Sequence, residues 1–165
     1  MKTTLKSFFF FLMLIAFSSA NGQSYNSAIG LRFGYPTSVT YKKFLSEKNA
    51  VEAYVGYRGY AGYSYVSVNL AYQIHNPINS ARNLSWYYGA GAGVAFYSYD
   101  SGFNGNGSIG IPISGYLGLD YKFEEIPLNL SVDWVPTIFV GGGFLSGFGG
   151  SYGALSARYV LNPKN

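Results

Sequence analysis

Apolar and polar residues alternate with a period of two along most of this chain. Between Ala28 and Tyr35, for example, Ile29, Leu31 and Phe33 occupy every second position, with glycine, alanine and arginine between them. Successive side chains of a β-strand point to opposite faces of the sheet, so this pattern predicts a strand with one apolar face. After residue 22 no segment has apolar residues at the spacing of a helix, which predicts an all-β fold.

The same alternation recurs in seven further segments, which are separated by residues that favour turns. The eight predicted strands are Ala28–Tyr35, Ser38–Leu45, Ala50–Arg58, Tyr65–His75, Leu84–Ser98, Ser108–Phe123, Leu128–Trp134 and Ser151–Leu161. Pro112 has no N–H group to donate to the ladder, so we expect a bulge or an irregular end in the sixth strand. An even number of strands, joined alternately by short and by looser connections, is typical of an up-and-down barrel with both termini at one end.

The two faces of these strands differ in charge and in size. One face is large, aromatic and nearly free of charge, with Lys43 as the exception. The other face holds many glycines and carries Arg32, Lys42, Glu52, Arg58, Asp120, Lys122, Asp133 and Arg158. Eight strands enclose an interior just wide enough for side chains, so small and polar residues suit the inside. Apolar residues suit a hydrocarbon exterior, where an Arg or Lys at mid-depth costs about 2 to 4 kcal/mol. A water-soluble barrel would keep its large apolar residues inside. We therefore predict an eight-stranded antiparallel up-and-down transmembrane β-barrel.

Composition agrees with an exterior that faces lipid. Charged residues make up 11% of the chain, against about 25% in average soluble domains, while aromatic residues make up 19%. Several aromatic residues fall near strand ends, where interfacial girdles are found in membrane barrels. These residues are Tyr35, Tyr57, Trp86, Tyr88, Tyr121, Trp134 and Tyr159. A plainer interpretation is that Tyr and Trp are common in sheets of every kind.

Residues 1–22 have the pattern of a cleavable signal peptide. Lys2 and Lys6 give a positive start, and Ser7 to Phe17 is an apolar run too short for the ~20 residues of a spanning helix. Cleavage after Ala20 or after Gly22 fits the small residues there, and the sequence does not choose between them. We expect residues 23–165 to form the barrel domain after export. Because the chain has no cysteine, neither a cysteine-linked lipid anchor nor a disulfide framework is available.

Three sequence blocks carry a resemblance to a known family. They are GLRFGYPTSVTYKKFL at Gly30–Leu45, WYYGAGAGVAFY at Trp86–Tyr97 and EEIPLNLSVDWVP at Glu124–Pro136. Together with the signal peptide, the chain resembles the small outer-membrane β-barrel domain proteins of the porin-like, eight-stranded superfamily. The resemblance covers nearly all of the mature chain and implies the outer membrane as location, its lipids as surroundings and the barrel-assembly machinery as a partner during insertion. Such barrels usually end on an aromatic residue, whereas here Tyr159 and Leu161 precede a short tail.

The candidate functional residues are the charged groups of the inward face. We expect Arg32, Glu52, Arg58, Asp120, Asp133 and Arg158 to form a paired network that fills the interior, because buried charges must be paired and eight strands rarely leave a channel. Lining a pore or binding a ligand is the alternative. His75, the single histidine, has no recognisable nucleophile and orienting group around it, so we interpret it as interfacial or structural and predict no catalytic site.

Other kinds of site find little support. One histidine, no cysteine and no tight acidic cluster argue against a metal, and the glycines match no phosphate-binding pattern before a helix, so we predict neither metal nor cofactor. The formal net charge is +4, of which Lys2 and Lys6 contribute two, and no basic cluster suggests nucleic-acid binding.

The pattern leaves three hypotheses for function. The first is a structural or porin-like outer-membrane barrel, expected to be a monomer, with a polar interior filled by side chains. The second is a ligand-binding or adhesion module that uses the outer loops Tyr99–Gly107 and Gly141–Gly150. The third is a lipid-modifying barrel enzyme.

Overall fold

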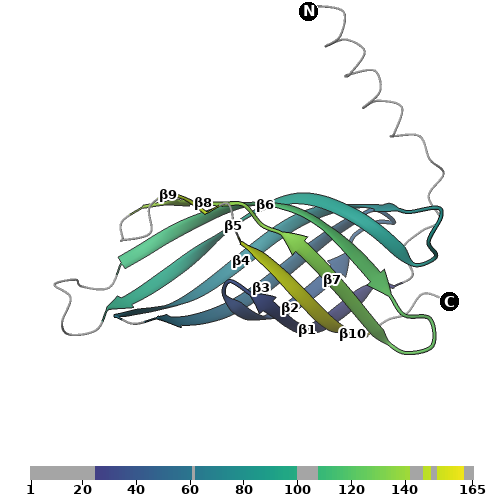
Figure 1. Cartoon of the computed structure of the whole chain (residues 1–165), viewed down its shortest axis with the longest axis horizontal. Coiled ribbons are helices and arrows are strands. Elements are labelled where there is room, and N and C mark those ends of the chain that lie inside the picture. Colours follow the sequence, from purple (N-terminus) through teal and green to yellow (C-terminus); the bar gives the residue numbers. More distant parts are fainter. Residues whose placement is uncertain (1–24, 61, 100–107, 142–146, 150–151, 162–165) are drawn as a thin grey trace, which may run out of the picture.

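A computed structural model describes residues 25–60, 62–99, 108–141, 147–149 and 152–161. Within these ranges the chain folds into ten β-strand segments (Figure 1). The segments are β1 (Ser27–Gly34), β2 (Thr37–Phe44), β3 (Asn49–Tyr60), β4 (Tyr63–Pro77), β5 (Leu84–Tyr99), β6 (Ser108–Lys122), β7 (Leu128–Trp134), β8 (Thr137–Val140), β9 (Gly147–Gly149) and β10 (Gly153–Val160). The predicted signal peptide and most of the predicted outer loops lie outside the described residues.

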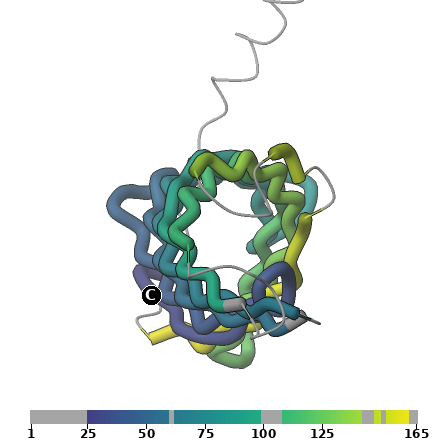
Figure 2. Tube along the Cα trace, turned by 90° about the vertical axis from the view of Figure 1, so that its left-hand side faces the viewer, coloured from purple at the N-terminus to yellow at the C-terminus, as the bar shows by residue number. Residues whose placement is uncertain are grey.

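The strands form one closed antiparallel barrel. Each strand from β1 to β6 pairs with the next along the chain, and β10 pairs with β1 and β7, which closes the sheet on itself. The trace seen end-on is a ring (Figure 2). β7 and β8 both pair with β6 and together form one strand position. β10 pairs with β7 and β9 pairs with β8, so β9 and β10 together form the next position. The ten segments therefore make eight strand positions. The predicted eight-stranded all-β barrel is confirmed.

The seventh strand is longer than the sequence pattern predicts. It is interrupted at Val135–Pro136 and then continues as β8, in the same register against β6. Proline cannot donate to a ladder, so pairing stops there, although the Pro136 carbonyl still accepts the N–H of Gly115 at 2.9 Å. β9 likewise falls within the Gly141–Gly150 stretch, for which the sequence predicts a loop, and this prediction is wrong for Gly147–Gly149.

The irregularity expected at Pro112 is present, and it takes the form of a gap. The ladder between β5 and β6 pairs Ala92 with Ile113 and resumes at Ala95 with Gly110, without a change of register. Because Pro112 has no N–H group, the ladder between β5 and β6 loses the pairs beside it. Neither strand gains an extra residue there, so the irregularity is not a bulge.

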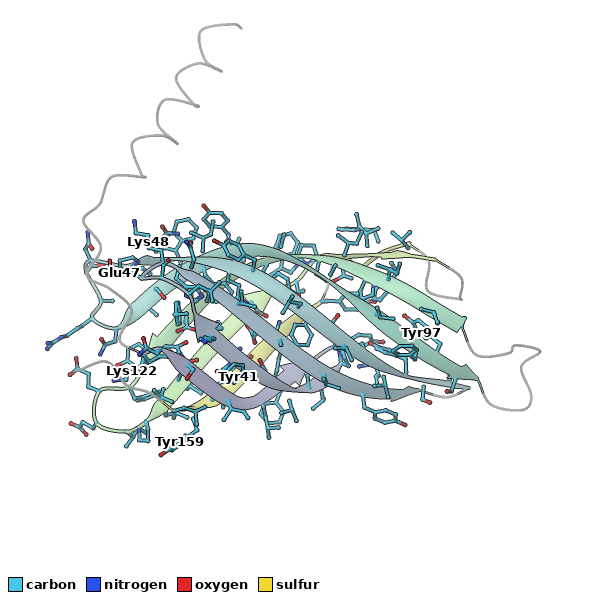
Figure 3. The ribbon with its side chains drawn as sticks, turned by 180° about the vertical axis from the view of Figure 1, so that it is seen from behind. Tyr41, Glu47, Lys48, Tyr97, Lys122 and Tyr159 are labelled. Atoms are coloured by element: carbon cyan, nitrogen blue, oxygen red, sulfur yellow. The ribbon has the colours of Figure 1, made fainter. Side chains whose placement is uncertain are left out.

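Side chains alternate between the two sides of the wall as the sequence pattern predicts. β2 shows strict alternation, with Ser38, Thr40 and Lys42 buried and Val39 and Tyr41 exposed. The same division holds on the other strands, so the outer surface is covered by large apolar side chains while polar ones fill the inside. Charged residues such as the exposed Glu47 and the half-buried Lys48 gather at the end of the barrel where β1 begins and β10 ends, which we call the end nearer to the termini (Figure 3).

In the part of the chain that the structure describes, no helix has the length and apolar character needed to cross a membrane.

Candidate functional site in the barrel interior

Six ionised side chains meet inside the barrel, in the half nearer to the termini. Three are cations and three are anions, and each is at most 6% exposed. They are Arg32, Lys42, Arg158, Glu52, Asp120 and Asp133, which we call the ion-pair network. Equal numbers of opposite charges leave the network without net charge, which is the condition under which charged groups can be buried together.

The pair between Arg32 and Asp133 joins β1 to β7 across the inner face of β10, the strand between them. Both terminal nitrogens of Arg32 donate to the Asp133 carboxylate, each at 2.8 Å, in the bidentate geometry that makes such pairs strong and directional. The hydroxyl of Tyr87 donates a third bond to Asp133 at 2.6 Å. The carboxylate is thereby fully enclosed by donors.

Glu52, on β3, is the centre of the network. Its carboxylate accepts hydrogen bonds from Arg158, from Thr40 Oγ1 at 2.6 Å and from Gln73 Nε2 at 2.7 Å. Lys42 Nζ lies 3.7 Å away. Strands β2, β3, β4 and β10 therefore meet at one carboxylate.

Asp120, on β6, connects the network to the end of the barrel where the termini lie. It accepts bonds from Lys42 Nζ at 3.0 Å and from Asn129 Nδ2 at 2.7 Å, and the hydroxyl of Tyr25 approaches at 3.4 Å. Tyr25 is fully buried and packs edge-on against Phe44, with ring centroids 5.0 Å apart. The segment before β1 therefore closes this end of the interior with an apolar cluster.

The structure brings five of the six candidate residues together and leaves one apart. Arg58 does not join the network: its guanidinium lies over the ring of Tyr35, 3.1 Å from the centroid. Lys42 takes part instead; the alternation places it on the charged face, but it was not among the six candidates. The alternation shows which residues point inward, but it does not show how far along the barrel each one lies.

Neutral partners of the network were also missed. Thr40, Gln73, Tyr87 and Asn129 point inward in the alternation, and each donates to one of the three carboxylates. Nothing in the sequence distinguishes them from other inward polar residues.

His75 is buried inside the barrel beside the network, near the end of β4. Its Nδ1 lies 3.4 Å from Ser85 Oγ and its Nε2 lies 3.3 Å from Gln73 Oε1. The ring stacks on Tyr87, with centroids 4.7 Å apart and planes inclined by 18°. Among the described residues, no group of three or more His, Asp and Glu side chains could hold a metal ion.

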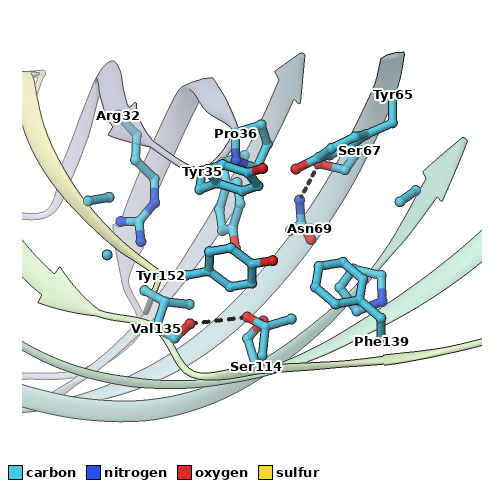
Figure 4. A pocket seen from close by; sticks show the side chains of 16 residues that line it. Arg32, Tyr35, Pro36, Tyr65, Ser67, Asn69, Ser114, Val135, Phe139 and Tyr152 are labelled. Atoms are coloured by element: carbon cyan, nitrogen blue, oxygen red, sulfur yellow. Dashed lines mark hydrogen bonds between the residues drawn. The ribbon is translucent and has the colours of Figure 1, made fainter. Parts of the chain in front are cut away.

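The other half of the interior is a hollow with a different lining (Figure 4). Rings dominate its wall, and we call it the tyrosine-lined hollow. The rings belong to Tyr35, Tyr54, Tyr65, Phe139 and Tyr152. Between them lie neutral hydroxyl and amide groups that bond to one another, such as Ser114 with Thr137 at 2.8 Å.

Tyr35 corrects one prediction from the sequence, which places it on the outward face and in a girdle. β1 ends at Gly34, so the alternation no longer governs the next residue. The ring turns inward and stacks on Tyr152, with centroids 4.8 Å apart and planes inclined by 21°. By contrast, Tyr57, Tyr88 and Tyr159 are exposed on the outside as expected.

Comparison with protein-family models, curated proteins and solved structures finds no match to this chain. A function for the chain must therefore be inferred from the arrangement of its own side chains.

Proposed function

We propose that this protein is an integral outer-membrane β-barrel with a structural role, whose interior is closed to solutes. The observation that carries the proposal is the inverted distribution of side chains: apolar ones cover the outside and ionised ones are enclosed. Leu70, Val132 and Leu155, on three different strands, are each more than half exposed, whereas Arg158 and Glu52 have no exposed surface. A soluble monomer rarely exposes so large and continuous an apolar surface.

The barrel also satisfies the main constraint that hydrocarbon places on a polypeptide. Backbone N–H and C=O groups find no water in the bilayer core, so a sheet can span it only when the strands pair around a closed ring. β1 and β10 pair over seven residues, which removes the open edge. An outward residue at mid-height, such as Leu70, has the alanines Ala53 and Ala92 as its cross-strand neighbours, so that part of the wall is apolar across three strands.

The ion-pair network supports a closed interior and argues against a pore. Its members come from six strands and fill the cross-section with direct hydrogen bonds. Eight-stranded barrels have interiors that side chains fill, so no continuous water path is expected. The rigidity of this packing is what a structural barrel requires.

Membrane location is tested by fractionating expressing cells and by comparing unheated and boiled samples on a gel. We expect the mature chain in the outer-membrane fraction, and we expect a detergent-extracted sample to migrate differently before and after boiling. Recovery in the soluble fraction, together with identical migration of the two samples, would contradict the proposal.

Closure is tested separately by planar-bilayer recording of the purified, folded chain. We expect no discrete conductance steps, because Arg32, Glu52 and Asp133 block the lumen through bonds between strands. An open porin serves as the positive control. Regular steps from the folded chain would show that the interior conducts.

A further inference from the structure

Tyr152 occupies the tyrosine-lined hollow in the way that a bound ligand would. Its ring stacks on Tyr35 and meets Phe139 edge-on, with centroids 6.1 Å apart and planes inclined by 86°. Both arrangements are the ones that aromatic pairs prefer. The hollow thus already holds one planar ring carrying a hydroxyl group.

Tyr35 is fixed from its other side. The Arg58 guanidinium lies 3.1 Å from its centroid, and one face of a single ring has no room for both Arg58 and Tyr152. The two must therefore contact opposite faces, and the cation holds Tyr35 in place with a cation–π contact. Tyr35 would keep its position if Tyr152 left, and it would present an open aromatic face.

Little space remains while Tyr152 is in place. The free volume of the hollow is about 30 Å³, which is room for one or two water molecules and no more. A Cβ atom added at Gly149 would overlap the Tyr152 ring, so the ring lies directly against that glycine. Any larger molecule can bind only where Tyr152 now lies.

The carbonyl of Tyr152 accepts the N–H of Val135 at 2.8 Å, whereas the short strand β9, which precedes it, makes few pairs. β9 has three residues and, among the described strands, pairs only with β8. The pairing register changes by one residue between Trp134–Gly153 and Thr137–Gly149, on either side of Tyr152. A strand with an unpaired edge and few hydrogen bonds belongs to the low-stability part of a structure. The Tyr152 ring lies against Gly149 of this strand, so a shift of β9 gives the ring room to rotate while its backbone stays bonded to Val135.

We propose that the tyrosine-lined hollow is a binding site for a small planar phenolic molecule, and that Tyr152 is the internal occupant which such a molecule displaces. The ligand is planar because it stacks on Tyr35 and lies against Phe139. It is uncharged because Arg32, the only charged side chain that lines the hollow in the described residues, gives both terminal nitrogens to Asp133. The site requires only the closed barrel, so the inference does not depend on membrane location.

The test uses 4-fluorophenol as the probe and fluorine NMR as the measurement, on the mature chain folded in one detergent throughout. We expect saturable binding to the wild type and binding about three- to tenfold tighter to Tyr152→Ala. The variant lacks the Tyr152 ring, so the probe no longer competes with it for the aromatic face of Tyr35, and one stacking contact accounts for a change of this size. Tyr35→Ala should abolish saturable binding and leave only partition into micelles. Tyr57→Ala, on the outer surface, serves as a matched control and should bind as the wild type does.

Gly149→Ala provides a second route to the same result if Tyr152→Ala folds poorly. The added methyl group displaces the Tyr152 ring without removing it, so we again expect tighter binding. Folding of every variant is checked by the gel shift on boiling. Cyclohexanol, which is not planar, should fail to displace the probe.

Three results would overturn the proposal. They are absence of saturable binding in both folded variants Tyr152→Ala and Gly149→Ala, unchanged binding in Tyr35→Ala, and equal competition by cyclohexanol and phenol. None of these results would bear on the membrane location, which is tested by fractionation.

Discussion

At the scale of single residues, the ion-pair network joins strands that lie far apart in the sequence. Arg32 and Asp133 are 101 positions apart, and Arg158 and Glu52 are 106 apart. Taking these charges out of water is costly, and the cost is offset only while each charge keeps its partner. The network therefore favours one pairing register of the strands around the barrel, since another register would separate the partners.

Glu52→Gln tests this requirement. The substitution leaves Arg158 and Lys42 buried without their shared carboxylate, so we expect the free energy of unfolding to fall by about 3 to 5 kcal/mol. The measurement is urea unfolding of the folded chain, followed by the unheated gel band. Glu124→Gln is the matched control, because Glu124 pairs with Arg82 on the surface, where a pair contributes about 1 kcal/mol or less. Equal unfolding midpoints for the two variants would contradict the account.

The sequence predicts which residues point inward and does not predict which of them meet. Period-two alternation correctly placed Arg32, Glu52 and Asp133 inside. Contact also depends on the stagger of the strands around the ring, which no local pattern contains. For that reason Arg58 appeared equivalent to the others, although it lies beside Tyr35.

At the scale of elements, regular alternation predicted the bounds of β1 to β7 and of β10 within two residues. It failed where proline or glycine replaced the pattern. β9 contains two glycines around Phe148 and lacks the composition of a strand, whereas β8 has β-prone residues but is only four residues long and follows Pro136. Both form because the neighbouring strand β6 or β8 supplies the hydrogen bonds, which is a tertiary effect.

Leu70→Arg tests which side of the wall faces lipid. Leu70 is 57% exposed and lies at the middle of β4. In a bilayer we expect the charge to destabilise the folded barrel, lowering the free energy of unfolding by about 2 to 4 kcal/mol. Leu45→Arg is the control: it is also exposed, at the barrel end near the termini, where a cost of about 0 to 1 kcal/mol is expected.

The measurement is folding into lipid vesicles at a series of urea concentrations. A water-soluble barrel would tolerate both arginines equally, since surface substitutions usually change stability by about 0.5 kcal/mol or less. Equal costs at positions 70 and 45 would therefore contradict an exterior that faces lipid.

At the scale of the whole molecule, the interior is divided into two parts. The half nearer to the termini is filled by charges that satisfy one another and by Tyr25, and the other half is a hollow in which the ring of Tyr152 lies. An interior filled by paired charges could be predicted from the number of strands and from the charged residues on their inward face. The hollow could not, because it depends on the inward turn of Tyr35 after β1 and on the register change beside Tyr152.

The most direct test of the account is the fluorescence of the two tryptophans, Trp86 and Trp134. They are the only tryptophans in the chain, and both line one apolar groove on the outer surface of β5, β6 and β7. In vesicles containing lipids with brominated acyl chains, we expect strong quenching of both, measured one at a time with Trp86→Phe and Trp134→Phe, and little quenching by aqueous iodide. Efficient quenching by iodide but not by brominated lipid would show that the apolar surface faces water, and the central claim would be wrong.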